Sequence, residues 1–243
     1  MRILLTVLAL ATTLSAQPTR ELSVLASGAV EGSMVALKGT IPAARFRFET
    51  SQGIATRLAA GETPDVLIAQ AAIVDQLIAD RKAIADTRIA LGRMPIGVAI
   101  GPNGTPPDLS NADALKAALL GAEVVIISRG ASGAFLEKAF RDLGIADQIE
   151  SKLRRESRGD DVMKGLGESR GKAIGFTMVS EIKYGERHGG RYIGLLPSAI
   201  QNYTPYDAIV LGSARDLNAA RAFVRALVLP EARAVLQKNG WEK

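Results

Sequence analysis

Residues 124–144 read VVIISRGASGAFLEKAFRDLG and combine two hydrophobic periods in one short stretch. The first five residues are apolar up to a serine, as in a buried strand, and a turn of small polar residues follows. Leu136, Phe140 and Leu143 then recur at helical spacing. Gly144 is placed to end that helix. The stretch therefore predicts one strand followed by one amphipathic helix.

The same order of strand and helix recurs on both sides of this stretch. Phe223 and Leu227 repeat the apolar spacing near the C-terminus, and we expect such stripes to form the core. Alternating strands and helices predict an α/β fold with a mostly parallel sheet covered on both faces. The other predicted strands lie at residues 22–26, 45–49, 66–69, 96–101, 174–179, 193–196 and 208–211.

The beginning of the chain has the order of a secretory signal peptide. Arg2 precedes an apolar run over residues 3–14, and the small residue Ala16 stands before Gln17. The run is too short to span a bilayer comfortably. We therefore expect residues 1–16 to be removed on export. The chain has no Cys for a disulfide or a lipid anchor, so we expect an unanchored protein in the periplasm.

Composition excludes several classes of function. The net charge is +5, but no dense basic helix and no basic residues interleaved with aromatics occur, so we expect no nucleic-acid partner. With one His and no Cys, a zinc site or a serine triad is not expected. His188 lies in a polar, glycine-bearing turn and is predicted to be exposed and without a role. Phosphate-loop and dinucleotide motifs are absent as well, so no metal and no cofactor are expected.

Three predicted junctions between a strand and a helix carry serine and glycine, at residues 25–28, 49–53 and 128–133. The first amides of a helix have no partner inside it, and the helix dipole makes that end positive, so each junction can attract an anion. In an open α/β sheet these junctions lie at the edge where ligands bind. A serine there can also be an ordinary N-cap. Several junctions facing one ligand would favour binding over capping.

Three parts of the chain resemble the periplasmic molybdate-binding proteins. They are Leu25-Ala26-Ser27 after the first strand, Ser51 before a helix that leads to residues 59–66, and the tail over residues 222–241. The resemblance covers nearly all of the chain after the signal peptide. It implies the type II periplasmic binding fold, in which two lobes joined by two crossings hold a ligand in the cleft.

Two proline-bearing segments are the expected crossings, Met94-Pro95 and the segment that ends at Pro205-Tyr206. Lobe 1 would then comprise residues 17–94 plus 206–243, and lobe 2 residues 95–205. Each lobe would carry a mostly parallel sheet with flanking helices.

The resemblance also implies a set of ligand-binding residues. Two hydroxyls come from lobe 1, and lobe 2 supplies backbone contacts and the end of the late strand. Where the family has a ligand-binding Tyr, this chain has Met178, which cannot donate such a hydrogen bond. Thr177 or Ser180 could substitute for it. The predicted ligand set is Ser27, Ser51, Ser132, Gly133, Val162, Thr177 and Met178.

Methionine in place of the family's tyrosine at position 178 affects which class of ligand we expect. A bare tetrahedral oxyanion needs donors on every side, whereas a thioether packs well against a carbon skeleton. A small organic carboxylate is therefore predicted to bind better than molybdate. The main functional hypothesis is a monomeric, passive solute-binding protein that presents this anion to the permease of an ABC importer.

An isomerase on the same fold is the second hypothesis, because proteins similar to this family include aconitate isomerase. Such a reaction needs a base and cationic groups that hold several carboxylates. Asp65, Glu49 and Tyr203 are candidates for the base, and the sequence singles out none of them. A segment at residues 154–158 contains three arginines that could hold a carboxylate or end a solvated helix.

Overall fold

The structure is a computed structural model that describes residues 21–243, so the predicted signal peptide lies outside the described residues. The strands are β1 Leu22–Ser27, β2 Ala44–Glu49, β3 Val66–Gln70, β4 Ile89–Ile100, β5 Val124–Ser128, β6 Leu153–Glu156, β7 Ala173–Met178, β8 Arg191–Leu195 and β9 Tyr203–Val210. The helices are α1 Glu31–Ala36, α2 Ser51–Ala59, α3 Ala71–Ala79, α4 Ala112–Gly121, α5 Ala131–Asp142, α6 Ala146–Ile149, α7 Gly159–Glu168, α8 Val179–Gly185, α9 Leu217–Ala226 and α10 Pro230–Lys238. A short 3-10 turn, η1 Gly28–Val30, joins β1 to α1. None of these helices has the length and apolar character of a membrane span.

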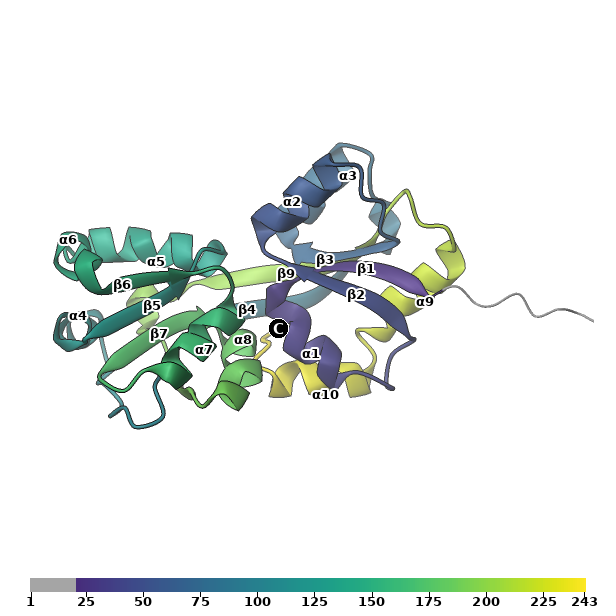
Figure 1. The fold of residues 1–243 in the computed structure, drawn as a ribbon. Coiled ribbons are helices and arrows are strands. Elements are labelled where there is room, and N and C mark those ends of the chain that lie inside the picture. The colour runs from purple at the N-terminus through teal and green to yellow at the C-terminus, as the bar shows by residue number, and fades with distance from the viewer. Residues whose placement is uncertain (1–20) are drawn as a thin grey trace, which may run out of the picture.

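The strands form two lobes (Figure 1). Lobe 1 contains β1, β2 and β3, lobe 2 contains β5 to β8, and β4 and β9 run between them. The hydrogen-bonded order is β2-β1-β3-β9-β4-β7-β5-β6, and β8 also pairs with β4. Pairs within a lobe, such as β1 with β3 and β5 with β7, are parallel as predicted. Every pair that involves β4 or β9 is antiparallel, because these strands carry the chain across and back.

Strand β4 is twice as long as the predicted strand at residues 96–101. Up to Pro95 it pairs with Tyr203 and the rest of β9, and from Ile96 it pairs with Met178 and the rest of β7. A single strand thus serves both sheets. The lobe boundaries at 94/95 and 205/206 stay a prediction.

The apolar pattern accounts for most of the elements. All six residues of β7 are buried, as expected for a strand covered on both faces. The predicted helix stripes are confirmed as core, since Leu136, Phe140 and Phe223 are each at most 2% exposed. Asn111 caps α4 by accepting a hydrogen bond from the backbone N–H of Ala114 at 2.9 Å.

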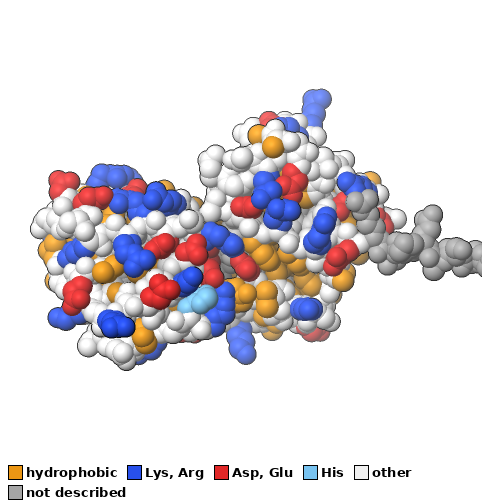
Figure 2. Space-filling view, viewed as in Figure 1, with side chains coloured by type: hydrophobic (Ala, Val, Ile, Leu, Met, Phe, Trp, Pro, Cys, Tyr) orange, Lys and Arg blue, Asp and Glu red, His pale blue; other side chains and the backbone are white. Residues whose placement is uncertain are grey.

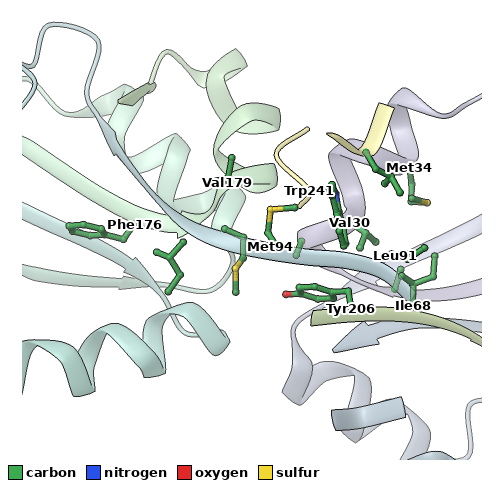
Figure 3. Packing of buried hydrophobic residues seen from close by; sticks show 14 of the residues in the cluster. Val30, Met34, Ile68, Leu91, Met94, Phe176, Val179, Tyr206 and Trp241 are labelled. Atoms are coloured by element: carbon green, nitrogen blue, oxygen red, sulfur yellow. The ribbon is translucent and has the colours of Figure 1, made fainter. Parts of the chain in front are cut away.

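The C-terminal tail ties the two lobes together. Trp241 is buried between them and donates its indole N–H to the Ser33 hydroxyl at 3.0 Å (Figure 3). Gly240 has a φ of +92°, and a side chain there would come within 2.4 Å of Val179. Glycine therefore lets the tail pass close to α8. The core continues from lobe 1 through Met94 into lobe 2 (Figure 3).

Two local predictions are wrong. Arg154 and Arg155 do not end a solvated helix but lie in the edge strand β6, where Arg155 forms ion pairs with Glu137 and Glu150. Four residues of mixed charge carry too little periodicity to mark a strand in the sequence. His188 is half-buried rather than exposed, and its Nε2 lies 3.1 Å from a carboxylate oxygen of Asp160.

Candidate ligand-binding pocket

A pocket of about 380 Å³, partly open to solvent, lies between the lobes. Lobe 1 and β9 contribute Ser27, Gly28, Ala29, Glu49, Thr50, Ser51, Gln70 and Tyr206. Lobe 2 contributes Ser128, Gly130, Ala131, Ser132, Ser157, Arg158, Gly159, Met178 and Glu181. Four predicted ligand residues are therefore brought together, namely Ser27, Ser51, Ser132 and Met178.

The other three predicted residues do not line this pocket. Gly133 lies in the first turn of α5, where a Cβ atom would be 1.6 Å from the carbonyl oxygen of Ser128. Glycine is therefore needed there for the close contact of α5 with β5. Val162 is fully buried against the inner side of lobe 2, and Thr177 is fully buried beneath Glu181. The ligand roles of all seven residues stay predictions.

Three helices of nine residues or more begin at the pocket. Thr50, and not Ser51, is the N-cap of α2, because its hydroxyl accepts from the backbone N–H of Gly53 at 3.1 Å. Helices α5 and α7 begin after Gly130 and Arg158, and neither has a side-chain cap. The free amides and positive dipole ends of these helices make the pocket attractive to anions.

Neighbouring polar groups contact the hydroxyls of Ser27, Ser51 and Ser132. Ser27 is buried and accepts from the backbone N–H of Ala29 at 3.4 Å. Ser51 accepts from the side-chain amide of Gln70 at 2.7 Å. The hydroxyl hydrogen of Ser51 therefore remains available for a ligand, whereas the hydroxyl of Ser27 also hydrogen-bonds the phenol of Tyr206. Ser132 lies 3.1 Å from the hydroxyl of Ser128 and is also buried.

The side-chain oxygen Oε1 of Gln70 is buried without a hydrogen-bond partner among the described residues. Exchanging the oxygen and nitrogen of this amide would leave a buried N–H in the same position. Either orientation presents one unpartnered polar atom in the pocket wall. Such atoms are rare in folded proteins, and a bound ligand is one explanation for them.

Glu181 places a carboxyl group in the lobe 2 wall. Thr177 donates its hydroxyl hydrogen to Oε2 of Glu181 at 2.5 Å. A Cβ atom on Gly159 would lie 2.2 Å from Oε2, and one on Gly28 would lie 3.3 Å from Oε1. The carboxyl group is thus wedged between the start of α7 and the η1 turn of lobe 1. Burial raises the pKa of Glu181, and the Thr177 hydrogen bond and the positive charge of Arg158 offset only part of the effect.

Arg158 joins the lobes at the edge of the pocket. Its Nη2 lies 2.5 Å from a carboxylate oxygen of Glu31, and both side chains are partly exposed. Figure 2 shows positive and negative side chains meeting where the lobes touch. Ser180 adds a buried contact on this side by donating to the carbonyl oxygen of Ala29 at 2.5 Å. The lobes are therefore in contact through η1, α1 and α8.

Tyr206 enters the pocket from β9. The residue is 1% exposed, and its ring packs edge-on against Trp241 with the ring centres 5.5 Å apart. In Figure 3 the phenolic oxygen points away from the lobe 1 core. Burial and the nearby negative charge of Glu181 raise the pKa of Tyr206, and hydrogen bonds to Ser27 and Gln70 only partly oppose this rise.

The three candidates for a catalytic base that come from the sequence are less well placed. Asp65 does not line the pocket. Burial alone would raise its pKa, but hydrogen bonds from the backbone N–H groups of Arg215 and Ser23 lower it below its ordinary value. Glu49 lines the pocket, but its carboxylate is 2.6 Å from Arg57. Tyr203 lies outside the lining, under the guanidinium of Arg93.

The described chain matches a known family, bacterial extracellular solute-binding protein, over residues 43–242. It belongs to that family. Among curated proteins, the aconitate isomerase of a Pseudomonas species is 31% identical over 241 residues, covering 93% of this chain and 89% of that protein. An isomerase and solute-binding proteins are thus both among the relatives of this solute-binding family member.

Solved structures confirm the predicted type II periplasmic binding fold. The periplasmic molybdate-binding protein of Azotobacter vinelandii is similar with a TM-score of 0.75 and 16% identity, covering 92% of this chain and 99% of that chain. Peb3 from Campylobacter jejuni is similar with a TM-score of 0.62 and 14% identity, covering 92% and 100% of the two chains. At these identities the likeness shows the fold of the family member and leaves its ligand open.

Sequence reasoning missed Glu181, Tyr206 and Gln70 in this solute-binding family member. The sequence does mark the position of Glu181, because this residue comes three positions after the buried strand β7, at the same kind of strand-to-helix junction as the serines. Gln70 ends β3 in the same way. Tyr206 had no such signal, since it lies within an antiparallel strand whose direction depends on the return of the chain.

Proposed function

We propose that this chain is an isomerase that holds a small unsaturated polycarboxylate between its lobes and moves a proton between two of its carbon atoms. The observation that carries this proposal is the carboxyl group of Glu181, which faces the same pocket as Arg158 and three helix N-termini. A carboxylate in the wall of a passive anion site opposes binding, because like charges repel. A site for proton transfer requires such a group.

The shape and chemistry of the pocket favour a substrate with more than one carboxylate. Helix α2 begins on one side of the cleft, and α5 and α7 begin on the other. Arg158 adds a guanidinium, which can bind a carboxylate through two parallel hydrogen bonds.

The reaction needs only proton transfer. In aconitate, the methylene hydrogens between a carboxylate and the double bond are the acidic ones. A base removes one of them, and the C–H electron pair forms a new double bond to the central carbon. The electron pair of the old double bond accepts a proton at the other end. Protons and electrons balance, and the base returns to its starting form.

The Pseudomonas aconitate isomerase supports this substrate class, since it aligns with 93% of the chain. Met178 supports it as well. This side chain lines the pocket and has no donor for an oxyanion, but its thioether suits the carbon skeleton of an organic acid. We therefore propose a tricarboxylate in preference to molybdate.

Passive binding is the second candidate function. The family itself favours it, because its description names solute binding. In that case the protein would capture the same carboxylate and present it to the permease of an ABC importer. Under either function we propose export to the periplasm as an unanchored monomer. Sequencing the N-terminus of the exported protein tests this, with Gln17 expected first and Met1 contradicting it.

Incubation with cis- and trans-aconitate in deuterated water separates the two functions. Proton NMR is expected to show interconversion of the isomers with deuterium entering the methylene and vinyl positions. Calorimetry on the same samples measures affinity. Binding without interconversion would favour the passive function, and tight binding of molybdate without binding of any carboxylate would contradict both.

A further inference from the structure

We infer that Tyr206 is a catalytic residue of the proposed isomerase, whose phenolic hydrogen holds the carboxylate next to the reacting carbon and stabilises the charge that develops there. This inference rests on the proposed function. When a proton leaves a carbon beside a carboxylate, negative charge spreads onto the carboxylate oxygens. A donor already aimed at those oxygens stabilises the transition state more than the ground state.

The position of Tyr206 suits this role. Glu181 on α8 and Tyr206 on β9 both line the pocket, and the negative charge of Glu181 is near enough to raise the pKa of the phenol. A substrate whose methylene group lies against Glu181 therefore has the adjacent carboxylate beside Tyr206. The raised pKa keeps the phenol protonated, so it remains a donor throughout the working pH range.

The phenol is also held rigidly. Tyr206 pairs with Gln70 of β3 on one side and with Gly92 of β4 on the other. Trp241 packs against the ring, and almost none of the residue is exposed. A donor fixed in this way needs little reorganisation during the reaction. The unpartnered amide atom of Gln70 lies in the same wall, where a polar group of a ligand would satisfy it.

Tyr206→Phe tests the inference, because it removes one oxygen and keeps the ring against Trp241. We expect kcat to fall about 100- to 1000-fold, as for removal of one donor to a developing oxyanion. Affinity for propane-1,2,3-tricarboxylate, which has no double bond and cannot react, is expected to weaken less than about tenfold, as for one modest hydrogen bond. Tyr203→Phe is the matched control, since Tyr203 lies on the same strand outside the pocket. Its kcat should equal that of the unmodified protein.

An unchanged kcat in Tyr206→Phe, or equal losses in kcat/KM and in affinity for the saturated acid, would overturn the inference while the proposed function stands. Absence of turnover by the unmodified protein would overturn both. Should Tyr206→Phe unfold, 3-fluorotyrosine at position 206 preserves the ring and makes the phenol a stronger donor. It is expected to change kcat more than the affinity for the saturated acid, and equal values to those of tyrosine would contradict the inference.

Discussion

The two walls of the pocket differ in charge. The wall from lobe 1 and β9 presents the neutral groups Ser27, Ser51, Gln70 and Tyr206, and its one carboxylate, Glu49, is bound by Arg57. The wall from lobe 2 presents Arg158 and Glu181. Neutral donors bind an anion in the same way at every pH at which the protein is folded. A carboxyl group can accept and release a proton, so we assign recognition chiefly to the first wall and chemistry to the second.

Glu181→Gln should have the largest effect, because it removes the carboxyl group of the lobe 2 wall and leaves only Arg158 charged there. The amide keeps the shape but cannot accept a proton, so we expect turnover of aconitate to fall at least about 100- to 10,000-fold. Affinity for the saturated tricarboxylate should hold or improve, since a like charge is removed. NMR rates and calorimetry measure the two effects. Glu231→Gln, in the exposed first turn of α10, is the control. Unchanged turnover in Glu181→Gln would contradict the assignment of chemistry to lobe 2.

Arg158→Lys keeps the positive charge of the same wall and removes the planar pair of donors. We expect affinity for the tricarboxylate to fall about 10- to 150-fold, the equivalent of 1.5–3 kcal/mol for a charged hydrogen bond. The ion pair with Glu31 should weaken at the same time. Arg154→Lys on β6 is a matched control, because Arg154 pairs with Glu156 outside the pocket. Equal affinities of the two variants would show that Arg158 only joins the lobes.

Ser51→Ala and Thr50→Ala separate ligand binding from helix capping within the neutral wall. Thr50 caps α2, so its loss should lower the free energy of unfolding by about 1 kcal/mol. Ser51 does not cap, and its loss should instead weaken ligand binding by about 1.5 kcal/mol. Ser27→Ala is expected to weaken binding similarly. Thermal unfolding and calorimetry, run side by side, separate the two kinds of effect. Loss of stability without loss of affinity in Ser51→Ala would remove Ser51 from the ligand set.

Met178→Tyr should move the lobe 2 wall toward the neutral, donor-rich type. A phenol at this position would supply the donor that an oxyanion lacks, so affinity for molybdate should rise relative to that for the tricarboxylate. The expected gain is about tenfold, corresponding to one net hydrogen bond. Titration of both proteins with both ligands gives the ratio. Tight binding of molybdate by the unmodified protein would contradict the predicted preference.

The smallest expected effect concerns pH. The pKa of Glu181 is raised above its ordinary value of 4.5, so the folded state binds its proton more tightly than the unfolded chain does. Stability should therefore fall as the pH rises from about 4.5 through the raised pKa and should then stay level. Arg158, Asp160 and Tyr206 are the charged or titratable groups that act on this carboxyl.

Glu181→Gln should remove this part of the decline, which thermal unfolding over a pH series measures. In the unmodified protein, turnover should rise over the same pH range, because the base must be deprotonated. Identical pH profiles of stability for the two proteins would show that the Glu181 carboxyl does not titrate differently on folding.

Local pattern was enough to predict much of this protein. The apolar runs located most of the strands, and the stripe with Leu136 and Phe140 was correctly predicted as core, because burial of one face leaves a period in the sequence. Serine and glycine at strand ends marked three junctions as anion sites, and the resemblance to the molybdate-binding proteins placed Ser27, Ser51 and Ser132 around one ligand; all three line the pocket.

The way in which the two lobes meet, by contrast, follows from the folded chain as a whole. β4 and β9 are antiparallel to their neighbours, and their apolar residues do not reveal which partner each half takes. The pairing of β9 with β3 and β4 turns Tyr206 toward the pocket, and the packing of α8 against η1 brings Glu181 beside Gly28. Tyr206 and Glu181 are 25 positions apart in the sequence and lie on a strand and a helix, which share no hydrophobic period. Their approach depends on strand direction and on contact between the lobes, which are properties of the assembled fold and leave no local pattern in the chain.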